Sequence, residues 1–244
     1  TDYASKILSK YKNHIKILNL VKNMGIGYGR NLAIKETRNR YVAALDSDVV
    51  PDKKWLLNMY NSMVKNKSHL CGGLLIEKYL KSNRYNYWRT IHIMHRFKEK
   101  IIPDVQSFIT GSNMLLKKDA WIKVGGYDEL FRTNGEDVHF CIRLRMNKFK
   151  ISYDTDAFCY HLQNDNLQSL LNRCWRYYIS GTGLKKPTYK RMVLRSIKHF
   201  KYCLINFFKD LINFRFSILD IHFRVLFNYI KMEYKSCKNN EIKF

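Results

Sequence analysis

Residues 40–65 read RYVAALDSDVVPDKKWLLNMYNSMVK, and this stretch decides the predicted fold. Its first residues, Arg40 to Leu45, predict a buried strand that ends abruptly at Asp46-Ser47-Asp48. Pro51 then predicts the start of a helix whose apolar side chains repeat at helical spacing. A strand, an acidic turn and a helix in this order are typical of an α/β domain, in which ligands bind beyond the carboxyl ends of the strands.

The flanking sequence continues the alternation of strand and helix signals. Extended segments are expected over 14–20, 68–80, 105–116 and 149–161, and helices over 30–37, 119–126, 136–147, 167–181 and 196–235. A glycine-bearing loop, NMGIGYGRN, is expected to open the first helix. The aromatic and basic segment 84–100 is expected to form an irregular or helical excursion over the sheet. Together these signals predict an α/β fold with a mainly parallel sheet.

Composition narrows the class of protein. Of the 244 residues, 46% are hydrophobic, which is enough for a full core and excludes disorder as the main state. No stretch of about 18 residues lacks charge, which argues against an integral membrane protein. The six cysteines include no CxxC pair, so we expect reduced thiols in a cytoplasmic protein rather than a zinc ribbon or a disulfide framework.

The charge balance is strongly basic, with 44 Lys and Arg against 20 Asp and Glu and a formal net charge of +24. Such a charge attracts polyanions, which include nucleic acid, anionic lipid and phosphorylated substrates. A basic nucleic-acid-binding protein is therefore one interpretation. The sequence has no recognisable helix-turn-helix, zinc-finger or RNA-binding signature, so no specific nucleic-acid partner is expected.

Carboxylates occur in two places where they can carry chemistry. Asp46 and Asp48 could hold a hard divalent cation that also bridges phosphate oxygens, or could be ordinary turn chemistry before a helix. Glu136 and Asp137 lie at a predicted helix start, where a carboxylate could act as a general base or simply favour the helix dipole. His161, at the end of a predicted strand, could complete a metal shell or be a satisfied core residue.

Two further segments could contact a ligand. The loop Gly111-Ser112-Asn113 allows a close backbone approach because glycine lacks a Cβ, although the glycine could equally mark a bulge. Arg30, at the mouth of the glycine-bearing loop, could pair with a phosphate or could be a solvated residue at a helix start.

The order of these motifs along the chain, from the start to His161, resembles the family 2 glycosyltransferases of the GT-A fold. The series consists of Asn23-x-Gly25, Arg30-Asn31, Asp46-Ser47-Asp48, Gly111-Ser112-Asn113, Gly126-Tyr127-Asp128, Gly135-Glu136-Asp137, Arg143 and Tyr160-His161. The resemblance implies a GT-A, Rossmann-like nucleotide-sugar-binding domain over residues 1–185. It also implies a UDP-, GDP- or dTDP-linked sugar donor, a glycan or lipid-linked glycan acceptor, and Mn²⁺ or Mg²⁺ as the cofactor.

The resemblance assigns a role to each candidate residue. Asp48 would be the direct metal ligand, Asp46 would contact the donor ribose or the metal, and His161 would contact the metal or the diphosphate. Asp137 would be the catalytic base for an inverting transfer, and Glu136 would position it or the acceptor. The remaining donor contacts would come from Gly111, Ser112 and Asn113 under the sugar and from Arg30 near the nucleotide.

Two departures from the family pattern lead to further expectations. The first strand, helix and second strand of the domain are missing from this sequence, so an N-terminally truncated enzyme is expected, with a catalytically inactive remnant as the alternative. Arg173 and Trp175 only loosely resemble the Gln-x-x-Arg-Trp signature of processive members, which favours the transfer of single sugars.

Residues 186–244 are expected to form a basic, amphipathic, helical C-terminal extension. They contain 13 Lys and Arg against 4 Asp and Glu, interleaved with Phe, Ile and Leu. Helices of this kind lie on anionic membrane surfaces, here the inner face of the membrane, where lipid-linked acceptors would be close at hand. The alternative is that the apolar stripe packs on the catalytic domain and the lysines are solvated.

Overall fold

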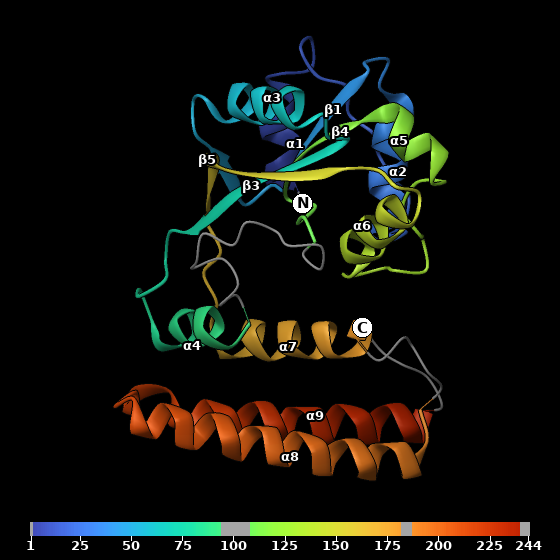
Figure 1. Ribbon diagram of the computed structural model, residues 1–244. Helices are drawn as coiled ribbons and strands as arrows, with labels where there is room; N and C mark the ends of the chain where they lie inside the picture. Colours follow the sequence, from blue (N-terminus) through green and yellow to red (C-terminus); the bar gives the residue numbers. More distant parts are fainter. Residues whose placement is uncertain (1, 94–107, 182–186, 240–244) are drawn as a thin grey trace.

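The computed structural model describes residues 2–93, 108–181 and 187–239, which form two layers (Figure 1). The upper layer is a sheet with helices on both of its faces, and the lower layer consists of helices alone. Two strands of the sheet lead directly down into helices of the lower layer (Figure 1).

The sheet has five strands in the order β1-β4-β3-β5-β2. Their bounds are β1 Tyr41–Leu45, β2 Val49–Pro51, β3 Leu70–Glu77, β4 Asn113–Lys117 and β5 Ile151–His161. β1, β3 and β5 run in one direction, and β4 and β2 run against them. The α/β sheet agrees with the expectation from the sequence, but most of its strand pairs are antiparallel and not parallel as expected. Among the described strands only β3 and β5 pair in parallel, because β4 inserts antiparallel between β1 and β3.

Helices cover both faces of the sheet because the strand side chains alternate in direction. Leu115 in β4 packs with Met59 and Met63 of α3 (Trp55–Asn66). Its neighbour Leu116 packs on the other face with residues of α2 (Ile26–Glu36) and α6 (Glu136–Met146). Two shorter helices, α1 (Asp2–Ser9) and α5 (Lys118–Lys123), complete the upper layer.

The lower layer has its own apolar core. Its elements are α4 (Arg84–His92), α7 (Leu167–Gly181), α8 (Tyr189–Ile212), the 3-10 helix η2 (Phe216–Ile218) and α9 (Leu219–Asn239). Trp88, Leu170 and Ile221, from three different helices, are buried together in this core. α7 thus packs on α9. The domain boundary expected near residue 185 stays a prediction. In the described part of the chain, no helix is long and apolar enough to span a membrane.

The strand expected over 14–20 is wrong. Residues 15–20 form no helix or strand, and the side chains of Ile17 and Leu20 are exposed. The apolar pattern expresses a local preference, but a strand forms only where a neighbour accepts its backbone hydrogen bonds. β1 is the edge strand nearest in sequence, and in the described residues it pairs with β4 alone.

Two helix starts also differ from expectation. α2 begins at Ile26, so part of the expected glycine loop is helical. Gly27 permits this close packing because it has no Cβ. A Cβ at that position would lie only 2.8 Å from the Asp128 carbonyl oxygen. Pro51 ends the edge strand β2, and α3 begins only at Trp55. An edge strand tolerates proline because its outer N–H has no partner to lose.

Candidate active site

The acidic turn after β1 is held beside the end of β5. The backbone N–H of Val49 donates to the Asp46 carbonyl oxygen at 3.1 Å, which closes the turn. Val49 is then paired with His161, and the backbone N–H of Leu162 donates to the Asp48 carbonyl oxygen at 2.7 Å. The side chains of Asp46 and Asp48 are 42% and 45% exposed, so both carboxylates can meet a ligand from solvent.

His161 is held between two carboxylates. Its Nε2 lies 3.3 Å from Oδ2 of Asp48, and its Nδ1 lies 2.6 Å from Oε1 of Glu77. Burial by itself lowers the pKa of His161, but the hydrogen bonds with Asp48 and Glu77 outweigh burial and raise this pKa to about 9. The hydrogen bond from His161 in turn lowers the pKa of Asp48. Asp48 and His161 therefore lie side by side, and a metal ion bound by both would displace the proton on Nε2 of His161.

Arg30 joins the acidic turn to the start of α6. Its guanidinium forms an ion pair with Glu136, and its Nη2 lies 3.2 Å from Oδ1 of Asp46. The arginine passes close to Gly111, where an added Cβ would lie 1.9 Å from Nη1 of Arg30. A larger residue at position 111 would therefore displace the guanidinium of Arg30.

Glu136 and Asp137 begin α6 after Gly135, whose φ of +93° suits glycine. Burial is the main cause that raises the pKa of Glu136 to about 7, and the nearby Asp137 adds to it. Oε2 of Glu136 is buried without a hydrogen-bond partner among the described residues. The Asp137 carboxylate accepts from the backbone N–H of Gly111 at 3.1 Å, and burial raises its pKa as well.

The rest of the predicted donor loop is less accessible. The side chain of Asn113 is fully buried, accepts from Trp55 Nε1 at 2.6 Å and donates to the Leu74 carbonyl oxygen at 3.1 Å. Asn113 therefore holds β4 against α3 and β3, whereas Ser112 beside it is partly exposed. The predicted site residues thus meet beside the carboxyl ends of β1 and β5, which we call the catalytic edge of the sheet. The Asn113 side chain is turned into the core.

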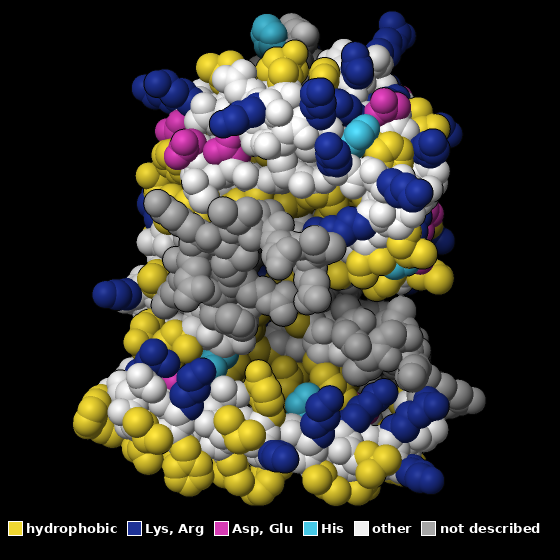
Figure 2. Space-filling model, in the orientation of Figure 1, with side chains coloured by type: hydrophobic (Ala, Val, Ile, Leu, Met, Phe, Trp, Pro, Cys, Tyr) yellow, Lys and Arg dark blue, Asp and Glu magenta, His cyan; other side chains and the backbone are white. Residues whose placement is uncertain are grey.

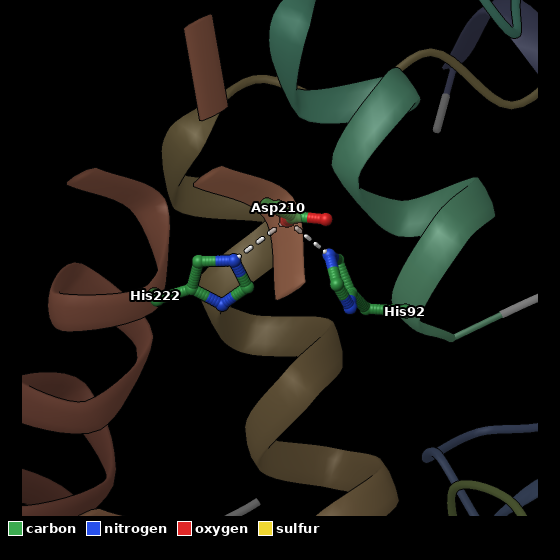
Figure 3. Close-up of side chains that lie close together, drawn as sticks. All are labelled: His92, Asp210 and His222. Atoms are coloured by element: carbon green, nitrogen blue, oxygen red, sulfur yellow. Dashed lines mark hydrogen bonds and ion pairs between the residues drawn. The ribbon is translucent and has the colours of Figure 1, made fainter. Parts of the chain in front are cut away.

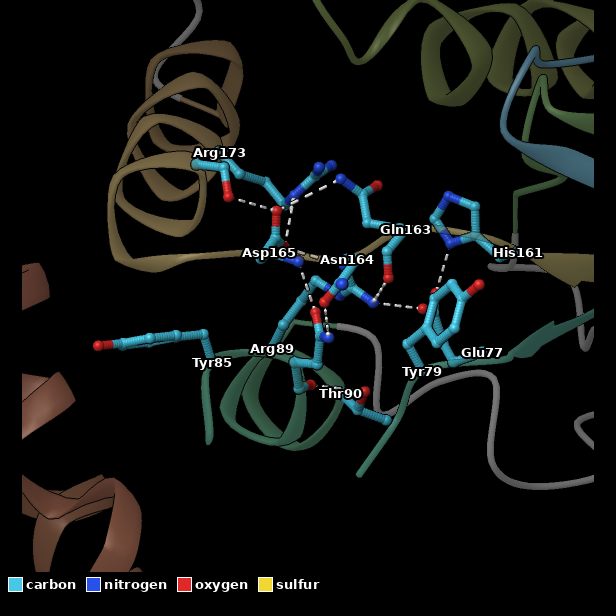
Figure 4. A network of polar contacts seen from close by, with 12 residues as sticks. Glu77, Tyr79, Tyr85, Arg89, Thr90, His161, Gln163, Asn164, Asp165 and Arg173 are labelled. Atoms are coloured by element: carbon cyan, nitrogen blue, oxygen red, sulfur yellow. Dashed lines mark hydrogen bonds and ion pairs between the residues drawn. The ribbon is translucent and has the colours of Figure 1, made fainter. Parts of the chain in front are cut away.

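A network of buried charges that the sequence did not predict lies behind His161 (Figure 4). Arg89 of α4 is fully buried, forms an ion pair with Glu77, and its Nη1 lies 2.8 Å from Oδ2 of Asp165. Nε of Arg173 in α7 lies 3.3 Å from the same Asp165 oxygen. The network ties the edge of the sheet to the helical layer. One signal was available, because Glu77 ends a strand in the same way that the acidic turn follows β1.

A second cluster lies within the helical layer, where His92, Asp210 and His222 bring potential metal ligands within 4.8 Å of one another (Figure 3). Nε2 of each histidine lies 2.7–2.8 Å from Oδ2 of Asp210. Trp88 Nε1 donates to Nδ1 of His222 at 3.4 Å, which leaves the ring proton on Nε2 for Asp210. Burial lowers the pKa of His92 to about 4. The two neutral histidines donate hydrogen bonds to Asp210, and these bonds hold α4, α8 and α9 together.

The layered sheet and its carboxylate-rich edge define the class of fold, which is the GT-A fold of glycosyltransferases. The structure of the mannosyltransferase PcManGT from Pyrobaculum calidifontis, in complex with GDP-Man and Mn²⁺, matches with a TM-score of 0.53. The match covers 72% of this chain and 50% of that one, at 12% sequence identity.

Residues 1–125 match the family described as Glycosyl transferase family 2, and the chain belongs to this family. It is 23% identical over 163 residues to a pre-mycofactocin glycosyltransferase of Mycobacterium tuberculosis, covering 65% of this chain and 34% of that protein. It is 22% identical over 181 residues to the rhamnosyltransferase WbbL of Escherichia coli, covering 65% and 68%. A poly-beta-1,6-N-acetyl-D-glucosamine synthase of Staphylococcus aureus is 24% identical over 197 residues, covering 74% and 45%. The chain thus spans about a third of its mycobacterial relative.

Proposed function

We propose that the protein transfers a sugar from a UDP-, GDP- or dTDP-linked donor to a hydroxyl group of a glycan or a lipid-linked glycan. The transfer would invert the anomeric carbon and would use Mn²⁺ or Mg²⁺. The observation that carries the proposal is the meeting of five separate chain segments at the carboxyl ends of the strands. Contacts between Asp48 and His161, between Arg30 and Glu136, and between Gly111 and Asp137 support it.

Asp48 and His161 would hold the metal ion, and Asp46 would contact either the ion or the donor ribose. The donor set fits such an ion, because two exposed carboxylates and an imidazole nitrogen 3.3 Å from one of them suit Mn²⁺, and the carboxylates suit Mg²⁺. When bound, the ion would neutralise negative charge on the departing diphosphate. The hydrogen bond that Nδ1 of His161 donates to Glu77 would keep the imidazole ring in the orientation that the metal needs.

Asp137 would act as the catalytic base. Its carboxylate is partly exposed and is oriented by backbone N–H groups, including that of Gly111. One carboxylate oxygen of Asp137 would take the proton of the acceptor hydroxyl while the hydroxyl oxygen attacks the anomeric carbon. The bond from this carbon to the diphosphate oxygen would break, and the nucleoside diphosphate would leave with the bonding electrons. Burial raises the pKa of Asp137, which strengthens it as a base.

Glu136 would position the site rather than take the proton, because it is buried and paired with Arg30. Arg30 would lie near the nucleotide, where its guanidinium can pair with a phosphate. Gly111 and Ser112 would approach the donor sugar through their backbone, and Asn113 would hold that loop in place.

We further propose that the protein works at the inner face of the membrane as a peripheral cytoplasmic protein. All six cysteines are free thiols, which suits a reducing compartment. A lipid-linked acceptor would then lie in the same plane as the basic C-terminal helices.

The test is a donor screen with Mn²⁺, in which release of the nucleoside diphosphate is measured with and without candidate acceptors. Asp137→Asn is expected to lower kcat by about 10²–10⁴-fold, since the amide cannot take a proton. Donor binding by titration calorimetry should stay unchanged in this variant. The matched control is Asp156→Asn, at an exposed residue in the part of β5 where its register with β3 shifts.

Asp48→Ala provides the second arm of the test. It is expected to abolish the Mn²⁺-dependent part of donor binding while the protein stays folded. Full turnover by Asp137→Asn would contradict the base assignment, and Mn²⁺-independent donor binding by the unmodified protein would contradict the metal assignment.

A further inference from the structure

The outer face of α8 carries a row of exposed apolar side chains. They are Val193, Ile197, Phe200, Phe208 and Leu211. Their spacing places them on one side of the helix. Two more large apolar side chains follow α8: Phe214, in the turn, and Phe216, at the start of η2, are 80% and 60% exposed. We call these seven residues the α8 stripe.

The side of α8 that adjoins the α8 stripe already meets the packing needs of the hairpin. Cys203 and Asp210 on that side are buried, and Phe207 contacts Phe223 of α9 with ring centroids 5.3 Å apart. The inner side of α9 buries Ile221 and Val225 in the core shared with α4 and α7. The apolar side of α9 therefore packs on α4 and α7 of the predicted catalytic domain, as one of the two alternatives expected, whereas the α8 stripe stays exposed.

Unneutralised positive charge surrounds the α8 stripe. Each of the three acids in residues 187–239 is paired with an arginine: Asp210 with Arg215, Asp220 with Arg224 and Glu233 with Arg195. The exposed lysines of the hairpin have no ion pair among the described residues, and they are Lys190, Lys198, Lys201, Lys209, Lys231, Lys235 and Lys238. Figure 2 shows apolar side chains along the lower edge of the molecule and a band of Lys and Arg just above them.

We propose that the α8 stripe and its flanking lysines bind the surface of an anionic lipid bilayer. Apolar side chains would enter the boundary between headgroups and acyl chains, and the lysines would meet lipid phosphates. A second copy of the chain is disfavoured as the occupant, because stripe-to-stripe contact would bring the two sets of lysines together. A nucleic acid would satisfy the lysines but would leave the apolar row without a partner.

The position of the hairpin connects this surface to catalysis, and this connection rests on the proposed transferase function. β3 leads into α4 and β5 into α7, so the carboxyl ends of these strands are directed toward the helical layer (Figure 1). Glu77 and His161 end these two strands. An acceptor carried by a lipid would therefore approach the catalytic edge from the side on which the bilayer lies.

The test is co-sedimentation of the full chain with vesicles of phosphatidylcholine alone or of equal parts phosphatidylcholine and phosphatidylglycerol. Binding is expected only to the anionic vesicles and should weaken at high salt. The double variant Phe200→Ser/Phe208→Ser should bind about tenfold or more weakly, because two inserted rings are lost. Its matched control is Leu56→Ser/Leu57→Ser, which removes two exposed apolar side chains of α3.

Lys198→Gln/Lys201→Gln should also weaken binding about tenfold, whereas Lys53→Gln/Lys65→Gln at the catalytic layer should leave it unchanged. Phe208→Trp should add a blue-shifted fluorescence signal that brominated lipid quenches. The proposal would be overturned by equal binding to both kinds of vesicle, by no binding, or by full binding of the stripe variant. A dimer that the stripe variant abolishes, with no lipid binding, would assign the face to a second copy. These readouts do not use catalysis, so they remain valid if the transferase proposal fails.

Discussion

Glu136→Gln should make the protein more stable at alkaline pH while removing a site residue. Glu136 is 2% exposed, and burial raises its pKa from the ordinary 4.5 to about 7. A carboxyl group with a raised pKa binds its proton more tightly in the folded state, so stability falls as pH rises through this interval. A difference of about 2.5 pKa units corresponds to about 3 kcal/mol of unfolding free energy at pH 8.

The glutamine variant lacks this titration, so the comparison with the unmodified protein isolates it. Relative to the unmodified protein, its free energy of unfolding should rise by about 3 kcal/mol between pH 4.5 and pH 8. The ion pair with Arg30 adds no separate change with pH, because Arg30 is one of the groups that set the pKa of Glu136. Urea denaturation at a series of pH values measures the difference, which corresponds to about 1 M in the midpoint.

The exposed carboxylate of Glu129 provides the matched control, because Glu129→Gln should follow the pH dependence of the unmodified protein. Parallel stability curves for Glu136→Gln and the unmodified protein would refute the reasoning. Such curves would mean that Glu136 is no harder to ionise in the folded state than in the unfolded chain.

Two further variants test contacts within the site. Gly111→Ala puts a Cβ 1.9 Å from Nη1 of Arg30, so donor binding should weaken by up to about 10²-fold. Gly29→Ala is the control and should leave donor binding unchanged, because no atom lies within 4 Å of the added Cβ. Equal effects of the two variants would contradict the steric argument. Glu77→Gln removes a carboxylate that raises the pKa of His161, so an NMR titration of the ring should give a pKa below about 9. An unchanged pKa would show that Glu77 and His161 do not pair in solution.

Several features of the candidate site follow from local sequence. The acidic turn lies at the end of an apolar strand, and the pair Glu136-Asp137 follows a glycine at a helix start, so each motif needs only a few neighbouring residues. The same holds for the amphipathic C-terminal helices, whose apolar spacing is visible in the sequence. These features are predictable because backbone preference and side-chain periodicity act over short distances along the chain.

What the sequence by itself determined is the set of local elements, the order of the motifs and the family that this order resembles. Only the tertiary structure decided that residues 15–20 form no strand, that Asn113 turns into the core, and which side of α8 remains uncovered. It also paired Glu77 with His161, which lie 84 residues apart in the chain. The reason is physical: such contacts depend on which elements pack together and on which hydrogen-bond partners packing brings near, and no local pattern in the chain encodes that choice.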